Sequence, residues 1–121
     1  MRNLLIFLGC ISFLSCKDSN ENVLQFRTGT FNTFLDNKEI TSTAVRNDTL
    51  QIETYNQKKD TFAITWNSNF EYELLKLNPK NELDSTPFVV KITGINNKSY
   101  TFTAHYKGSN FKQKGKAVKT D

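Results

Sequence analysis

The sequence predicts an all-β protein, a small antiparallel meander of about eight strands that closes, or nearly closes, into a barrel. Apolar and polar residues alternate with a period of two over most of the chain, whereas helical spacing does not recur. Stretches rich in asparagine and aspartate separate these segments, as expected for turns. The length of 121 residues fits one domain. A β-sandwich is the alternative arrangement of the same strands.

The expected strands follow one another at short intervals. The clearest alternations are Phe62-Ile64-Trp66, Phe70-Tyr72-Leu74, Phe88-Val90-Ile92 and Tyr100-Phe102-Ala104-Tyr106. Asparagine and aspartate between them tolerate the positive φ of tight hairpins, and such short links favour a meander. In order, we expect strands at about 28–35, 39–46, 49–55, 61–66, 70–77, 88–95, 99–107 and 111–119.

Two places depart from this regularity. The connection at 78–87 is long, and it contains Pro79 and Pro87, between which a helical turn would fit. Leu74 and Leu75 are adjacent apolar residues where strict alternation would place only one. We therefore expect a β-bulge between these two leucines.

The width of an eight-stranded barrel leaves two alternatives for its interior. Such a barrel holds either its own side chains or one small ligand. The residues expected to face inward include Phe62, Ile64, Trp66, Tyr72 and Phe102. We expect these large side chains to fill the interior; in the alternative, they line the site of a small apolar ligand.

The first sixteen residues have the pattern of an export signal. Arg2 precedes an apolar run, Leu4 to Leu14, that is too short to cross a bilayer and fits a signal peptide. The run ends in Phe13-Leu14-Ser15-Cys16, which resembles the lipobox of bacterial lipoproteins, where the cysteine is lipidated. We expect a leader at 1–15, a lipidated tether at 16–25 and a β-barrel domain at 26–121. The protein would then be an outer-membrane lipoprotein of the cell envelope, on the periplasmic face or the cell surface.

The mature chain resembles a family of small flavobacterial (Bacteroidetes) lipoproteins. The shared segments are Thr28-Gly29-Thr30-Phe31, Arg46-Asn47-Asp48, Trp66 with Tyr72, Lys76-Leu77-Asn78-Pro79-Lys80, Tyr100-Thr101-Phe102 and residues 114–119. Members of this family are mostly uncharacterised, and some bear the name DNA topoisomerase IV. A topoisomerase needs a DNA gate many times this size, so the resemblance implies a lipoprotein without that activity. Gly29-Thr30-Phe31 also resembles the first strand of lipocalin-like barrels, which implies a ligand carrier.

The composition argues against catalysis. The chain has one histidine and two cysteines, too few for a zinc cluster and for most histidine-based catalysis. By alternation His105 faces outward, and the five glycines form no phosphate-binding loop. We expect no enzymatic activity, no cofactor and no metal.

Positive charge gathers in the last expected strand. The net charge is +4, and Lys112, Lys114 and Lys116 alternate along one face. This ridge would suit an anionic envelope polymer; in the alternative, the lysines protect a sheet edge from aggregation. We expect no nucleic-acid partner, because no exposed aromatic platform interleaves the lysines.

Two three-residue segments resemble Bacteroidetes O-glycosylation sites. They are Asp48-Thr49-Leu50 and Asp84-Ser85-Thr86, with Thr49 and Ser85 as the acceptors. The second lies in the long connection, where a glycan has room.

Three functions remain open at this stage. The first is a monomeric, non-enzymatic interaction module of the envelope. The second is a lipocalin-like carrier of a small apolar ligand. The third is an inhibitor of an envelope-directed hydrolase that acts through the loop at 79–87.

Overall fold

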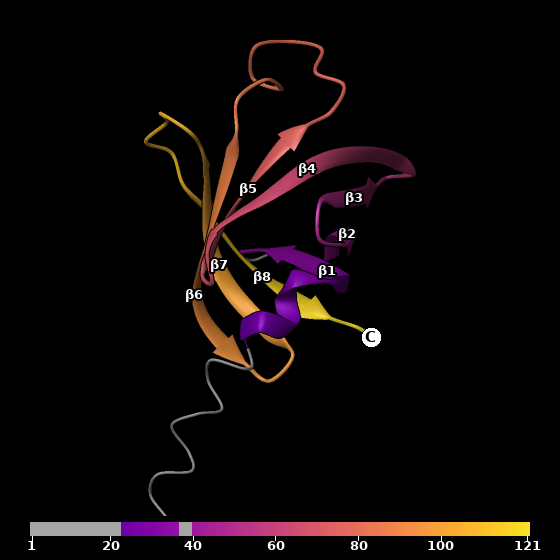
Figure 1. Ribbon diagram of the computed structural model, residues 1–121, viewed down its shortest axis with the longest axis vertical. Coiled ribbons are helices and arrows are strands. Elements are labelled where there is room, and N and C mark those ends of the chain that lie inside the picture. Colours follow the sequence, from indigo (N-terminus) through magenta and orange to yellow (C-terminus); the bar gives the residue numbers. More distant parts are fainter. Residues whose placement is uncertain (1–22, 37–39) are drawn as a thin grey trace, which may run out of the picture.

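The computed structural model describes residues 23–36 and 40–121, which form a closed antiparallel barrel (Figure 1). Its strands are β1 (Gly29–Leu35), β2 (Ile40–Arg46), β3 (Leu50–Tyr55), β4 (Lys58–Ser68), β5 (Glu71–Lys76), β6 (Phe88–Asn96), β7 (Ser99–Tyr106) and β8 (Gln113–Lys119). Each strand pairs with the next along the chain, and β1 pairs with β8 to close the barrel. The predicted barrel is confirmed, and the β-sandwich alternative is wrong. Among the described residues, no helix has the length and apolar character needed to span a membrane.

Tight turns with positive φ connect two of the hairpins. Asn56 and Gln57 have φ of 50° and 68° between β3 and β4, and Asn97 has φ of 56° between β6 and β7. In the β3–β4 turn both central residues have positive φ, which gives the turn the twist of its strands. The expected strands left residues 56–60 for this turn, but the turn is shorter because β4 already begins at Lys58.

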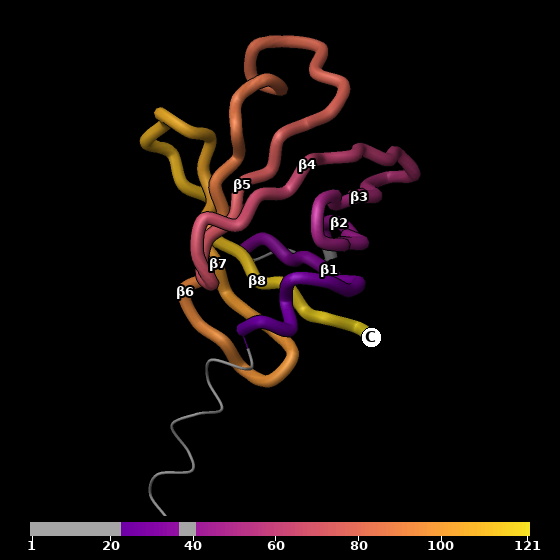
Figure 2. The backbone as a smooth tube through the Cα atoms, viewed as in Figure 1, coloured from indigo at the N-terminus to yellow at the C-terminus, as the bar shows by residue number. Residues whose placement is uncertain are grey.

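The connection between β5 and β6 extends well beyond the end of the barrel (Figure 2). It contains the predicted helical turn, in which the amide of Ser85 donates to the carbonyl of Asn81 at 3.3 Å and the amide of Thr86 to that of Leu83 at 3.0 Å. The side chain of Asp84 accepts from the amide of Lys80 at 3.0 Å. These bonds order the loop from within.

The bulge expected between Leu74 and Leu75 is wrong. The pairing of β4 with β5 is continuous there, with Ile64 opposite Leu74 and Ala63 opposite Leu75. Leu74 points inward, whereas Leu75 points outward and is 41% exposed. The prediction of a bulge required both leucines to be buried, whereas only Leu74 is. The register instead shifts in β1 after Thr33, near the end of β4, and in β6 after Ile92.

A short helical segment covers one end of the barrel. Residues 23 and 24 are helical and lead into the 3-10 helix η2 (Gln25–Arg27). Val23 and Phe26 are completely buried. Gln25 donates to the carbonyl of Asn97 in the β6–β7 turn at 3.0 Å, and Arg27 donates to Asn69 in the β4–β5 turn at 3.1 Å. We call this the closed end; the tether expected to run to residue 25 must end before Val23, because Val23 belongs to the core.

Gly115 allows β7 and β8 to approach each other closely. It lies opposite Phe102, and a Cβ atom at position 115 would lie 2.6 Å from the Phe102 ring and 2.7 Å from the backbone oxygen of Phe34. Gly115→Ala is therefore expected to lower the free energy of unfolding by about 1–3 kcal/mol, measured by urea denaturation. Gly94→Ala is the control, because a Cβ atom there would meet only the hydroxyl of Thr101, at 3.0 Å, whose exposed hydrogen bond to Thr93 is a small loss. Equal losses in both variants would contradict this explanation.

Candidate ligand-binding site

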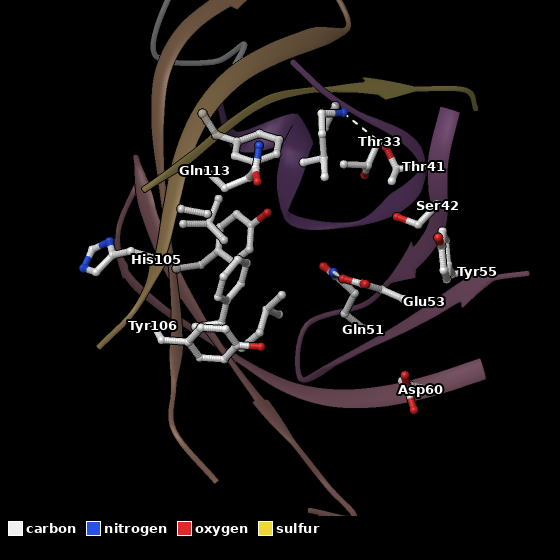
Figure 3. A pocket seen from close by; sticks show the side chains of 18 of the residues that line it. Thr33, Thr41, Ser42, Gln51, Glu53, Tyr55, Asp60, His105, Tyr106 and Gln113 are labelled. Atoms are coloured by element: carbon white, nitrogen blue, oxygen red, sulfur yellow. Dashed lines mark hydrogen bonds between the residues drawn. The ribbon is translucent and has the colours of Figure 1, made fainter. Parts of the chain in front are cut away.

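The barrel contains a cavity of about 500 Å³, within the range typical of small-molecule sites. Figure 3 shows Gln51, Glu53 and Tyr106 pointing into it, while the ring of His105 points away. The expected filled interior is therefore wrong. Two of the inward positions that line the cavity, Ala104 on β7 and Ala117 on β8, are too small to fill the space.

The cavity runs from the closed end toward the opposite end, which we call the mouth. Near the mouth it is lined by Tyr55, Ser109 and Phe111, which lie beside the β3–β4 and β7–β8 connections. Phe111 is 73% exposed. The long β5–β6 connection leaves the barrel at the same end (Figure 1). Access from solvent is therefore through the mouth.

Four polar residues form the bottom of the cavity, and we call them the floor cluster: Arg46, Gln51, Tyr72 and Tyr100. Arg46, 4% exposed, donates from Nε to Oε1 of Gln51 at 2.7 Å and from Nη1 to the carbonyl of Phe26 at 2.7 Å. Its Nη2 donates to the hydroxyls of Tyr72 and Tyr100, each at 3.1 Å. The two hydroxyls lie 2.8 Å apart and share a hydrogen bond.

Aromatic rings surround the buried guanidinium. Its central carbon lies 4.3 Å from the ring centroid of Phe31 and 4.7 Å from that of Tyr72. A cation over an aromatic face is attracted by the ring quadrupole, more strongly where water is excluded. These contacts and four hydrogen-bond acceptors offset part of the cost of burying the charge.

Among the residues that the structure describes, no carboxylate forms an ion pair with Arg46. Within residues 23–36 and 40–121, the ion pairs are Lys76 with Asp60 and Asp84, and Lys107 with Glu73. Gln51 instead links Arg46 to an acid, because its Nε2 donates to Glu53 at 2.7 Å. Glu53 is partly buried on the cavity wall, two residues closer to the mouth along β3.

Burial shifts the acidity of two groups at the cavity. It raises the pKa of Glu53, although the hydrogen bond from Gln51 and the charge of Arg46 act in the opposite direction. Burial also raises the pKa of the Tyr72 hydroxyl well above its usual value. Tyr72 therefore stays protonated and can donate a hydrogen bond.

Glu53→Gln is expected to raise the free energy of unfolding at neutral pH. The pKa of Glu53 is higher in the folded protein than the ordinary value of 4.5, so the folded state holds the proton to a higher pH. The free energy of unfolding of the wild type therefore falls as pH rises from 4.5, the ordinary pKa of the unfolded chain, to the higher pKa of Glu53 in the folded protein. Above that folded-state pKa the loss is complete. Glutamine mimics the protonated acid, so the advantage of the variant should shrink as pH falls toward 4.5. Urea denaturation across this range is the measurement; Glu82→Gln on the exposed loop is the control, and an equal gain there would contradict the prediction.

A second hollow of about 230 Å³ adjoins the cavity. The two share five residues on their walls: Glu53, Asp60, Leu74, Phe88 and Tyr106. Lys76 points toward this hollow and bridges Asp60 of β4, at 3.5 Å, and Asp84 of the long loop, at 3.6 Å. These ion pairs connect the loop to the rim of the barrel.

The five residues predicted to line a ligand site are divided by the structure. Tyr72 and Phe102 line the main cavity, and Phe62 lines the second hollow. Ile64 lines neither and packs within the hydrophobic core. Trp66 also lines neither; its ring packs against Tyr72, with 4.7 Å between centroids, and Arg27 lies over it at 4.8 Å.

The lysine ridge is interrupted, and its strand has no free edge. Lys114 and Lys116 lie exposed on β8, but Lys112 precedes the strand. Because β8 pairs with both β1 and β7, the alternative that these lysines protect a sheet edge is wrong. Binding of an anionic polymer by the ridge stays a prediction.

The remaining predicted positions are exposed or lie outside the described residues. Thr49 is exposed in the β2–β3 connection at the closed end, and Ser85 is exposed in the long loop. Both could be reached by a modifying enzyme. Cys16 and the leader at 1–15 lie outside the described residues.

Sequence reasoning missed most of the floor cluster. In β2 and β3 the apolar residues Val45 and Ile52 point outward and are 52% and 38% exposed, while Arg46 and Gln51 point inward. A reading that places apolar residues inside therefore inverts these strands. The usable signal was Ala44, a small apolar residue in the same alternation as Arg46.

Comparisons of this chain with protein-family models, with curated proteins and with solved structures find no match. The fold and the cavity define an eight-stranded antiparallel barrel with an apolar wall and a charged, hydrogen-bonded floor.

Proposed function

We propose that this protein is a non-enzymatic carrier of a small, largely apolar molecule that enters the barrel through its mouth. The observation that carries the proposal is the cavity of about 500 Å³. Its wall includes Phe88, Val90 and Phe102, which would bury the apolar part of a ligand. The floor cluster supplies a few fixed polar groups, the combination that gives small-molecule sites their orientation and specificity.

A neutral fluorescent probe tests this proposal. N-phenyl-1-naphthylamine should gain emission when added to the protein, because its fluorescence rises in an apolar site. Ala104→Phe should abolish the gain, since Ala104 lines the cavity and a phenyl group there would occupy it. Thr103→Phe places the same ring one residue away on the outward face and should leave binding intact. No probe binding to the wild type, or equal binding by both variants, would refute the carrier function.

The carrier is proposed to be an outer-membrane lipoprotein held by a lipid on Cys16. The support is the lipobox-like segment Leu14-Ser15-Cys16 after a short apolar run. Two or three acyl chains give stable anchoring, whereas one gives only marginal binding. Cys16→Ala should prevent incorporation of labelled palmitate, with Cys10→Ala as the control; continued labelling of the Cys16 variant would contradict the anchor.

A second candidate is an envelope interaction module that uses the outer surface of the barrel. Val45 pairs with Ile52, Ile52 pairs with Thr61, and the amide of Leu77 bonds to the carbonyl of Thr61 at 3.0 Å. Val45, Ile52 and Leu77 are all substantially exposed. Photo-crosslinking groups at Val45 and Leu77 should give one defined adduct in cells, and a group at Thr103 should not. The same pattern at all three positions would refute this function.

A further inference from the structure

The floor cluster has more hydrogen-bond donors than acceptors. Tyr72 and Tyr100 each carry one hydroxyl hydrogen, and only one of the two is used in the bond between them. Both oxygens already accept from Nη2 of Arg46. Nη1 of Arg46 carries two hydrogens, and one of them is bonded to the carbonyl of Phe26. Among residues 23–36 and 40–121, no acceptor is bonded to the remaining hydroxyl hydrogen or to the remaining Nη1 hydrogen.

The floor cluster also carries a positive charge that is only indirectly balanced. Arg46 is buried, with only 4% of its surface exposed, and it lines the cavity. Its link to Glu53 passes through the neutral amide of Gln51. A buried cation with unused donors favours a negatively charged acceptor, because charge-assisted hydrogen bonds are the strong ones.

We propose that the ligand carries a carboxylate, and that Arg46 with the Tyr72–Tyr100 pair binds this group at the bottom of the cavity. This inference rests on the proposed carrier function. The apolar body of the ligand extends along the wall toward the mouth. Two carboxylate oxygens accept the donors that the protein leaves unused.

Glu53 is the group that opposes this assignment. One of its oxygens accepts from Gln51, and the other has no partner in the described part of the chain. A ligand with an amine would use that oxygen instead. Charge therefore distinguishes the two modes: an acid binds at Arg46, whereas an amine binds at Glu53.

The test compares three probes with the same ten-carbon chain: decanoate, decanol and decylamine. Titration calorimetry should show that the wild-type protein binds decanoate about tenfold or more tightly than decanol, as a hydrogen-bonded charge contributes about 1.5–3 kcal/mol, and decylamine most weakly. Trp66 emission gives a second readout, because Trp66 packs on Tyr72 of the floor cluster. Decanol binding as tightly as decanoate, or decylamine binding most tightly, overturns the inference while the carrier function stands. Failure of all three ten-carbon probes while the neutral dye still binds overturns the inference alone. Failure of the neutral dye overturns the carrier function and, with it, the inference that rests on it.

Three variants locate the effect. Arg46→Met should remove the preference for decanoate, and Lys116→Met, which deletes an exposed positive charge of β8, should keep it. Glu53→Gln should increase the preference by removing the opposing charge, and this variant serves where Arg46→Met fails to fold. A preference unchanged in Glu53→Gln, or lost equally in Lys116→Met, would overturn the assignment.

Discussion

Arg46→Ala is expected to lower the free energy of unfolding by about 3–5 kcal/mol. Removing the guanidinium takes the donor from the carbonyl of Phe26 and from the amide oxygen of Gln51. The two tyrosine hydroxyls keep only the bond between them. It also leaves a void between the rings of Phe31 and Tyr72. This loss is a large part of the total stability of an ordinary domain. Urea denaturation measures it, provided that the dependence of the unfolding free energy on urea concentration is the same in variant and wild type.

Arg27→Ala is the matched control for this prediction. Arg27 also lies over an aromatic ring, that of Trp66, but it is only partly buried, and its Nε has no hydrogen-bond partner within the described part of the chain. Its removal should cost no more than about 1 kcal/mol. Equal losses in the two variants would show that the floor cluster does not stabilise the barrel.

Phe26→Ala is expected to destabilise the protein by about 3–5 kcal/mol. Phe26 is completely buried, and its ring lies edge-on to Tyr100 with 4.9 Å between centroids. Its removal opens a void beneath the floor cluster, and the segment that covers the closed end loses its main apolar contact. Thermal or urea denaturation measures the loss.

Leu24 provides the control in the same helical segment. It is 50% exposed, so Leu24→Ala should change the stability little. If the two variants were equally stable, residues 23–27 would be a tether rather than a part of the fold.

The strands could be predicted because local patterns specify them. Alternation such as Phe70-Tyr72-Leu74 and turn residues such as Asn97 depend on neighbours in sequence, and all eight strands form where these patterns occur. Closure into a barrel could also be predicted, because pairing the first strand with the last leaves no edge strand with unpaired backbone groups.

The cavity and its floor could not be predicted, because they depend on which face of each strand is inside. Arg46 and Gln51 come together only through the pairing of β2 with β3, and Tyr72 and Tyr100 reach them from strands far along the chain. The empty space itself results from small residues, such as Ala104 and Ala117, at positions that line the cavity. A count of large apolar residues therefore overestimated how full the interior is.

The position of Val23 determines which end of the barrel would lie nearer a membrane if a lipid on Cys16 anchors the protein there. Val23 is buried at the closed end, and Cys16 precedes it by seven residues, which span at most about 25 Å when fully extended. A lipid on Cys16 would thus tether the barrel by the end opposite its mouth. The opening would face away from the anchoring leaflet, and ligand would be exchanged with the aqueous compartment or a soluble donor rather than drawn directly from the lipids beneath.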